Sequence, residues 1–63
     1  MCELNAFLID GTDKKLLMED VVRLVVNDND ITITGMLGDT KQVKGKILRV
    51  DITKQETLIQ KID

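Results

Sequence analysis

The 63-residue sequence lacks histidine, serine, tryptophan, tyrosine and proline, and it contains one cysteine and one phenylalanine. Without serine and histidine it cannot form a serine triad, and its only thiol, Cys2, has no histidine base. A general acid or base would have to be a carboxylate or a lysine. The adjacent carboxylates Glu19 and Asp20 would point to opposite faces of a strand, so they cannot act as a pair. We therefore predict that the protein is not an enzyme.

Further absences limit the location and the partners of the protein. No apolar run approaches the ~20 residues of a membrane-spanning helix. The first apolar stretch, residues 6–9, is too short for a signal peptide and has no basic leader. We therefore predict a cytoplasmic protein with no membrane partner. Phe7 is the only aromatic residue, so the chain offers no platform on which nucleic-acid bases could stack.

The composition is that of one small globular domain, residues 1–63. Hydrophobic residues make up 43% of the chain, charged residues make up 32%, and the net charge is -2. Lys44, Lys46 and Arg49 could form a weak basic stripe, but acidic residues balance it, whereas phosphate binding normally needs a basic surplus. We therefore predict no nucleic-acid partner. A domain this small buries only about 60% of its unfolded surface, so a metal or a second subunit commonly adds stability.

Short runs rich in valine, isoleucine, leucine and threonine alternate with turn residues along the chain, which is typical of an all-β protein. The predicted strands cover residues 2–9, 16–20, 21–26, 31–34, 41–52 and 56–62. A helix over residues 14–26 is the alternative there, but the β-branched content of this stretch disfavours it. Gly45 lies in the middle of one strand, where we expect a bulge or a sharp bend. About six short antiparallel strands with such a bend predict a small, partly closed barrel of the SH3-like type.

The alternation of apolar residues predicts which side chains face the interior of this barrel. The expected inward-facing residues are Leu4, Ala6, Leu8, Ile31, Ile33, Leu48, Val50 and Ile52. Four further apolar residues exceed what one face can hold, namely Phe7, Ile9, Ile47 and Ile59. They either pack under loops at the rim of the barrel or lie buried against a partner. We favour the second alternative and predict a homodimer.

Two other groups of residues have structural interpretations. The stretch Asn27–Asp30 resembles the start of a calcium-binding loop, but it lacks the glycine and the glutamate that follow in such loops. Asparagine and aspartate tolerate left-handed backbone angles, so we predict a hairpin turn there. Met18 and Met36 could be soft metal ligands, but methionine more often fills a core.

Cys2 is the residue most open to a functional interpretation. A lone cysteine is usually a small, inert, buried hydrophobe. Near the terminus, however, its thiolate can act together with an α-amine whose pKa is only about 7.7–8.0. The amine belongs to Met1, or to Cys2 if the initiator methionine is removed. Amine nitrogen, amide nitrogen and thiolate can form fused chelate rings in the tetragonal geometry that suits Ni(II) or Cu(II). If the termini meet at a two-fold axis, two Cys2 thiolates could share one metal.

Three stretches of the sequence resemble the CooT family of nickel-binding accessory proteins, which are linked to the maturation of carbon monoxide dehydrogenase. They are MCE at residues 1–3, LLMEDVVRL at residues 16–24 and GMLGDTKQVKGKILRVDI at residues 35–52. The last stretch carries a spaced pattern of Leu37, Gly38, Lys41, Val43, Gly45 and Ile47. The likeness covers essentially the whole chain.

The resemblance implies a small β-barrel homodimer that binds Ni(II) through the cysteine of its Met-Cys start, which is Cys2 here. It also implies a client such as carbon monoxide dehydrogenase or another nickel enzyme. Met1 would add nitrogen ligands, and Glu3 could contribute an oxygen. The alternative hypothesis is an SH3-like module that binds nucleic acid or another protein and holds no metal.

Overall fold

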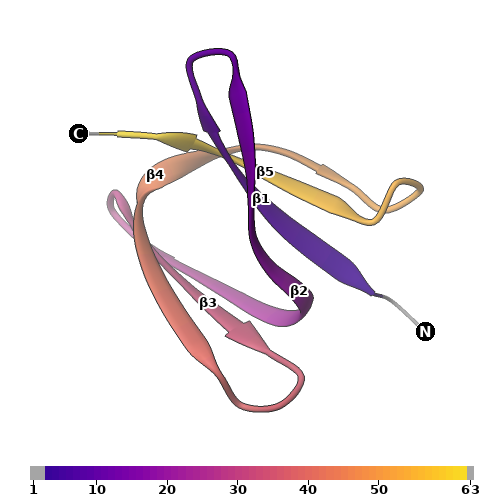
Figure 1. The fold of residues 1–63 in the computed structure, drawn as a ribbon. Coiled ribbons are helices and arrows are strands. Elements are labelled where there is room, and N and C mark those ends of the chain that lie inside the picture. Colours follow the sequence, from indigo (N-terminus) through magenta and orange to yellow (C-terminus); the bar gives the residue numbers. More distant parts are fainter. Residues whose placement is uncertain (1–2, 63) are drawn as a thin grey trace.

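A computed structural model describes residues 3–62 as five β-strands that close into a barrel (Figure 1). The strands are β1 (Leu4–Asp10), β2 (Asp13–Asn27), β3 (Asp30–Gly35), β4 (Thr40–Asp51) and β5 (Glu56–Lys61). Each strand pairs antiparallel with the next, and the ring closes through a parallel pairing of β1 with β5. The described residues contain no helix, and hence none long and apolar enough to cross a membrane.

The predicted small all-β barrel is confirmed, with five strands in place of about six and with a closed ring in place of a partly closed one. Residues 16–20 and 21–26 belong to one 15-residue strand, β2, which bends at Asp20 without ending. Asp20 has a φ of 53°, which aspartate tolerates better than most residues. The ring is closed, and one of its five pairings is parallel.

Two long strands serve two neighbours each. The first half of β2 pairs with β1 up to Val21, and residues 21–27 pair with β3. In the same way, β4 pairs with β3 through residues 40–44 and with β5 through residues 45–51. The change of neighbour in β4 falls at Gly45, the residue at which the sequence predicted a bulge or a sharp bend, and the register shift of this strand lies between Ile47 and Arg49. A Cβ atom on Gly45 would lie 2.5 Å from the Gln60 carbonyl oxygen and 2.6 Å from Ile59 Cγ2.

A compact apolar core fills the barrel. Its buried members are Ala6, Met18, Val21, Ile31, Ile33 and Ile59. The inward placement of Ala6, Ile31 and Ile33 and the core role of Met18 are therefore confirmed. Ile59 was expected to be surplus, but its side chain is completely buried because it points inward from β5.

The prediction that Leu48, Val50 and Ile52 form an inward apolar face is wrong. These side chains are 48–63% exposed. The pairing of β4 with β5 shifts register between Ile47 and Arg49, and such a bulge breaks the regular alternation of side chains. Met36, expected in the core, is also exposed, since it lies in the turn after β3.

Replacing Gly45 with alanine should destabilise the protein by about 3 kcal/mol, because the new methyl group would meet backbone that cannot move aside. Gly11→Ala is the control. Gly11 has a φ of +62° and nothing within 4 Å of an added Cβ, so only the left-handed backbone costs about 1 kcal/mol. Urea unfolding of both variants measures the difference. Equal losses of stability would show that the close approach at Gly45 does not constrain the fold.

Candidate metal site at the amino-terminal end

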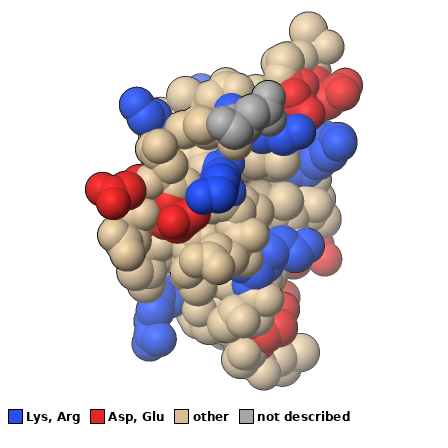
Figure 2. All heavy atoms as spheres, turned by 90° about the vertical axis from the view of Figure 1, so that its left-hand side faces the viewer, with Lys and Arg blue, Asp and Glu red and all other residues tan. Residues whose placement is uncertain are grey.

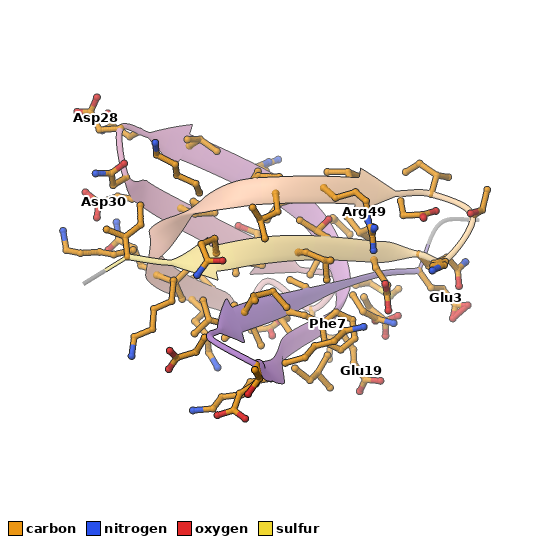
Figure 3. The ribbon with its side chains drawn as sticks, turned by 90° about the horizontal axis from the view of Figure 1, so that it is seen from above. Glu3, Phe7, Glu19, Asp28, Asp30 and Arg49 are labelled. Carbon is orange, nitrogen blue, oxygen red and sulfur yellow. The ribbon has the colours of Figure 1, made fainter. Side chains whose placement is uncertain are left out.

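The predicted metal ligands Met1 and Cys2 lie outside the described residues. The structure does describe the residues that follow them, from Glu3 onward. Glu3 is exposed, and β1 begins at Leu4, which pairs with Val21 of β2. The chain therefore enters the barrel beside the bend of β2. This is the end of the molecule at which Figure 3 labels Glu3 and Glu19, opposite the hairpin that carries Asp28 and Asp30.

Hydrogen bonds from two other segments fix the start of β1, and one of these segments is bonded in turn to a third. The backbone N–H of Asn5 donates to the carbonyl oxygen of Gln55 at 2.9 Å. The side-chain Oδ1 of Asn5 accepts a bond from the backbone N–H of Asp20 at 3.4 Å. The carbonyl of Asp20 in turn accepts from the N–H of Met36 at 2.9 Å. The β2 bend, the β3–β4 turn and the β4–β5 turn are thus tied to the residues that directly follow Cys2 and Glu3.

Asn5, Asp20 and Gln55 form a hydrogen-bonded frame around the start of β1. The sequence analysis did not single out Asn5. Its place in an alternating strand marks it only as an outward-facing residue. Its role depends on the bend at Asp20, fifteen positions away, and on Gln55, which also has a left-handed φ of 57°. The one local signal was the aspartate at the bend, since Asp enters this backbone region more readily than most residues.

The turn that carries Gln55 is organised by the Asp51 carboxylate. Thr53 Oγ1 donates a hydrogen bond to Asp51 Oδ1 at 2.5 Å, and the Lys54 backbone N–H donates to the same oxygen at 3.1 Å. The Thr53 hydroxyl first, and the Lys54 amide second, lower the pKa of Asp51 below its usual value of 3.8. Both bonds favour the ionised carboxylate, so the turn is held in place at neutral pH.

Residues 3–62 contain no group of three or more cysteine, aspartate or glutamate side chains placed to hold a metal ion. The acidic stretch at Asn27–Asp30 is the predicted hairpin turn, because it joins β2 to β3 and Asp28 has a φ of 55°. The Asp30 carboxylate is paired with the Lys44 ammonium at 3.1 Å.

The predicted basic stripe is not a continuous positive surface. Lys44 is one of its members, and the ion pair with Asp30 neutralises it. On the side of the molecule that lies to the left in Figure 1, Figure 2 shows lysine, arginine and acidic side chains interspersed among uncharged residues. Elsewhere, Lys14 pairs with Glu56 at 2.9 Å and also lies over the ring of Phe7, 4.5 Å from its centroid. Lys14 and Lys44 are thus each paired with a different nearby carboxylate.

Comparison with known proteins gives consistent matches over nearly the whole chain. Residues 1–60 match the family described as CO dehydrogenase accessory protein CooT. A crystal structure of a protein from Carboxydothermus hydrogenoformans, provisionally described as CooT, superposes with a TM-score of 0.89 at 27% identity, covering 98% of this chain and all of that one. An uncharacterised protein of Methanothermobacter thermautotrophicus is 38% identical over 63 residues, all of this chain and 94% of its own length. An uncharacterised protein of Archaeoglobus fulgidus is 33% identical over 43 residues, 68% of this chain and 96% of its own.

The hydrogen bonds of the β4–β5 turn make a prediction about acid titration. The pKa of Asp51, followed by NMR, should lie below 3.8 in the wild type and rise toward 3.8 in Thr53→Ala, because the largest cause of its lowering is removed. The carboxylate supports the turn fully above the unfolded-state value, and this support is lost as the pH falls through the lowered pKa. An unchanged Asp51 pKa in Thr53→Ala would contradict this assignment.

Proposed function

Because the chain belongs to the CooT family of CO dehydrogenase accessory proteins, we propose that it binds Ni(II) as cargo at its amino terminus, with the thiolate of Cys2 as the principal ligand. The observation that carries the proposal is the extent of the family match, which begins at residue 1 and so includes the Met1-Cys2 pair. The role that follows is delivery of nickel during maturation of carbon monoxide dehydrogenase or of another nickel enzyme.

The chemistry of the donors supports nickel as the cargo. The Cys2 thiolate, a backbone amide nitrogen and the terminal amine of Met1 are a sulfur- and nitrogen-rich set, which suits a tetragonal Ni(II) or Cu(II) ion. The amine loses its proton near pH 7.7–8.0, so binding strengthens as the pH rises through about this range. The frame of Asn5, Asp20 and Gln55 supports a fixed position for the segment that leads into β1. We place this activity in the cytoplasm, where thiols stay reduced.

A homodimer is the second part of the proposal. Among residues 3–62, ten large apolar side chains are more than a third exposed. They are Leu16, Val22, Val25, Val26, Met36, Leu37, Ile47, Leu48, Val50 and Ile52. Contiguous apolar surface on a small protein marks sites of association. A two-fold dimer would also supply two Cys2 thiolates, which is the basis for one nickel ion per two chains.

The same exposed residues favour a second candidate function. A protein-interaction module without a metal would use this apolar surface to recruit another protein. In that case Cys2 would be a structural residue, and its replacement would leave the function unchanged. Metal binding by variants of Cys2 separates the two candidates.

Titration of the purified protein with Ni(II) should saturate at one ion per two chains, with a thiolate-to-nickel absorption band. Cys2→Ser should lose the band and bind at least about 100-fold more weakly, because removing a ligand costs more than the 10–100-fold typical of outer-shell partners. Met36→Leu is the matched control, since it removes another sulfur that is 54% exposed. Calorimetry and absorbance measure both quantities.

Equal nickel binding by the wild type and Cys2→Ser would contradict the proposed site, and so would the absence of binding in both. Urea unfolding of the metal-free variants checks that any loss of binding is not a loss of folding. Weakened binding in Met36→Leu with full binding in Cys2→Ser would place the sulfur ligand in the β3–β4 turn instead.

A further inference from the structure

The turn between β3 and β4 presents two long apolar side chains to solvent. Met36 and Leu37 are the central residues of this turn, and their side chains are 54% and 92% exposed. Among residues 3–62, no other large apolar side chain is as exposed as that of Leu37. An apolar side chain stabilises a fold through the surface that it removes from water. Leu37 removes almost none, so the fold alone does not account for an apolar residue at this position.

Hydrogen bonds hold the turn in one shape. The N–H of Gly38 donates to the carbonyl oxygen of Gly35 at 3.0 Å, which closes a four-residue β-turn. The N–H of Gly35 donates to the carbonyl oxygen of Asp39 at 2.8 Å, and the N–H of Met36 donates to that of Asp20 at 2.9 Å. Gly38 has a φ of +88°, which glycine adopts readily. The two apolar side chains thus project from a backbone that is already ordered, which lowers the entropy cost of binding them.

Carboxylates without cationic partners surround the turn. A Cβ on Gly35 would lie 2.5 Å from Oδ1 of Asp39, so the carboxylate of Asp39 lies against the turn in the space that a side chain at residue 35 would fill. Glu19 and Asp20, at the adjoining bend of β2, are both exposed. None of these three carboxylates forms an ion pair within residues 3–62. The apolar tip of the turn therefore has an acidic rim.

The acidic rim favours a different protein over a second copy of the chain as the partner of this turn. Lys41 contributes one positive charge nearby, and its ammonium donates to the carbonyl oxygen of Leu17 at 3.3 Å. The three carboxylates still leave the surface negative. A second copy placed on the turn about a two-fold axis would set this surface against itself, and like charges that face each other weaken association. A protein with an apolar pocket rimmed by lysine or arginine would complement both the side chains and the charge.

The turn lies beside the segment that carries the proposed nickel ligand. Asp20 connects the two, since its carbonyl oxygen accepts from the N–H of Met36 and its own N–H donates to the side chain of Asn5. Asn5 follows Cys2 by three residues, a length of chain that spans at most about 11 Å. A protein bound to the turn would therefore be close to an ion held at Cys2.

We propose that the turn at residues 35–39 is the surface through which the protein docks onto nickel-free carbon monoxide dehydrogenase. Met36 and Leu37 enter an apolar pocket of that enzyme, and the carboxylates of the acidic rim pair with lysine or arginine side chains around the pocket. A few such anchors in well-fitted pockets carry most of the binding energy of an interface. The inference rests on the delivery of nickel in the proposed function, and it adds the docking surface and the chemistry of the partner.

Binding of the nickel-loaded protein to nickel-free carbon monoxide dehydrogenase, the enzyme named in the family description, tests the docking turn. Leu37→Ala should weaken the complex at least about 30-fold, the effect of truncating an interface anchor. Val26→Ala is the control, because Val26 is also more than half exposed but lies next to the hairpin at the opposite end of the barrel. Biolayer interferometry measures both affinities. Circular dichroism should show both variants folded, since neither side chain belongs to the core.

Reversal of one charge tests the acidic rim. Glu19→Lys should slow association and reduce its dependence on salt, because it removes attraction to a basic partner. Asp13→Lys changes the net charge by the same amount from an exposed position on the same strand. Asp13 adjoins the β1–β2 hairpin at the top of Figure 1, whereas the docking turn is at the bottom, so Asp13→Lys should leave association nearly unchanged. Equal slowing by both variants would contradict a localised acidic rim.

The outcomes separate this inference from the proposed function. A complex that Leu37→Ala forms as tightly as the wild type would overturn docking through this turn and leave the delivery of nickel intact. A wild type that does not bind the nickel-free enzyme would overturn both the docking turn and delivery to carbon monoxide dehydrogenase. Because nickel binding by Cys2→Ser is measured separately, neither result counts against the metal site.

Sedimentation equilibrium of Leu37→Ala excludes the other occupant of the turn. The variant should have the same mass in solution as the wild type, because the turn faces a different protein. Dissociation of wild-type dimers into monomers on this substitution would show that the turn belongs to the contact between two copies, and the proposed docking would then be wrong.

Discussion

Closure of the barrel depends on the missing side chain at Gly45. There the backbone of β4 passes so close to β5 that a Cβ would meet the Gln60 carbonyl at 2.5 Å. The close passage lets β4 leave β3 and continue beside β5. One strand then pairs with different neighbours along its two halves, and so does β2, which bends at Asp20. Sharing two strands in this way allows a chain of only 63 residues to enclose a core.

The bend in β2 also connects the fold to the proposed function. It presents the N–H of Asp20 to the side chain of Asn5 and the carbonyl of Asp20 to Met36. A segment held in this way can carry a terminal chelating group at a constant position without contributing ligands of its own. An arrangement with the metal ligands at the terminus and the partner surface on the barrel would suit a carrier of metal cargo, because few ligands are needed to bind the ion.

Local pattern predicted the parts of the fold in which neighbouring residues determine the structure. The alternation of Ile31 and Ile33 with threonines placed β3 correctly, since β3 is regularly paired on both sides. Gly45 was recognisable as a special position because a glycine inside a strand often marks a bulge, a bend or the close approach of another backbone. The same alternation failed at Leu48, where a bulge exposes residues that appeared to face inward.

The candidate site was predictable only in its chemistry. From position alone, a structural cysteine was the more common interpretation of Cys2, and the family resemblance favoured a metal ligand instead. The frame around the site could not be read from the sequence, because Asn5, Asp20 and Gln55 come together only through strand pairing.

The most direct test of the account is a titration with Ni(II) followed by the amide signals in a two-dimensional NMR spectrum of the isotope-labelled protein. Binding at the terminus predicts that the signals of Glu3, Leu4 and Asn5 change first, together with Asp20, to which Asn5 is bonded. The signals of the hairpin at residues 27–30 should stay fixed. Changes centred on that hairpin, with residues 3–5 unaffected, would contradict the central claim that nickel is held at Cys2.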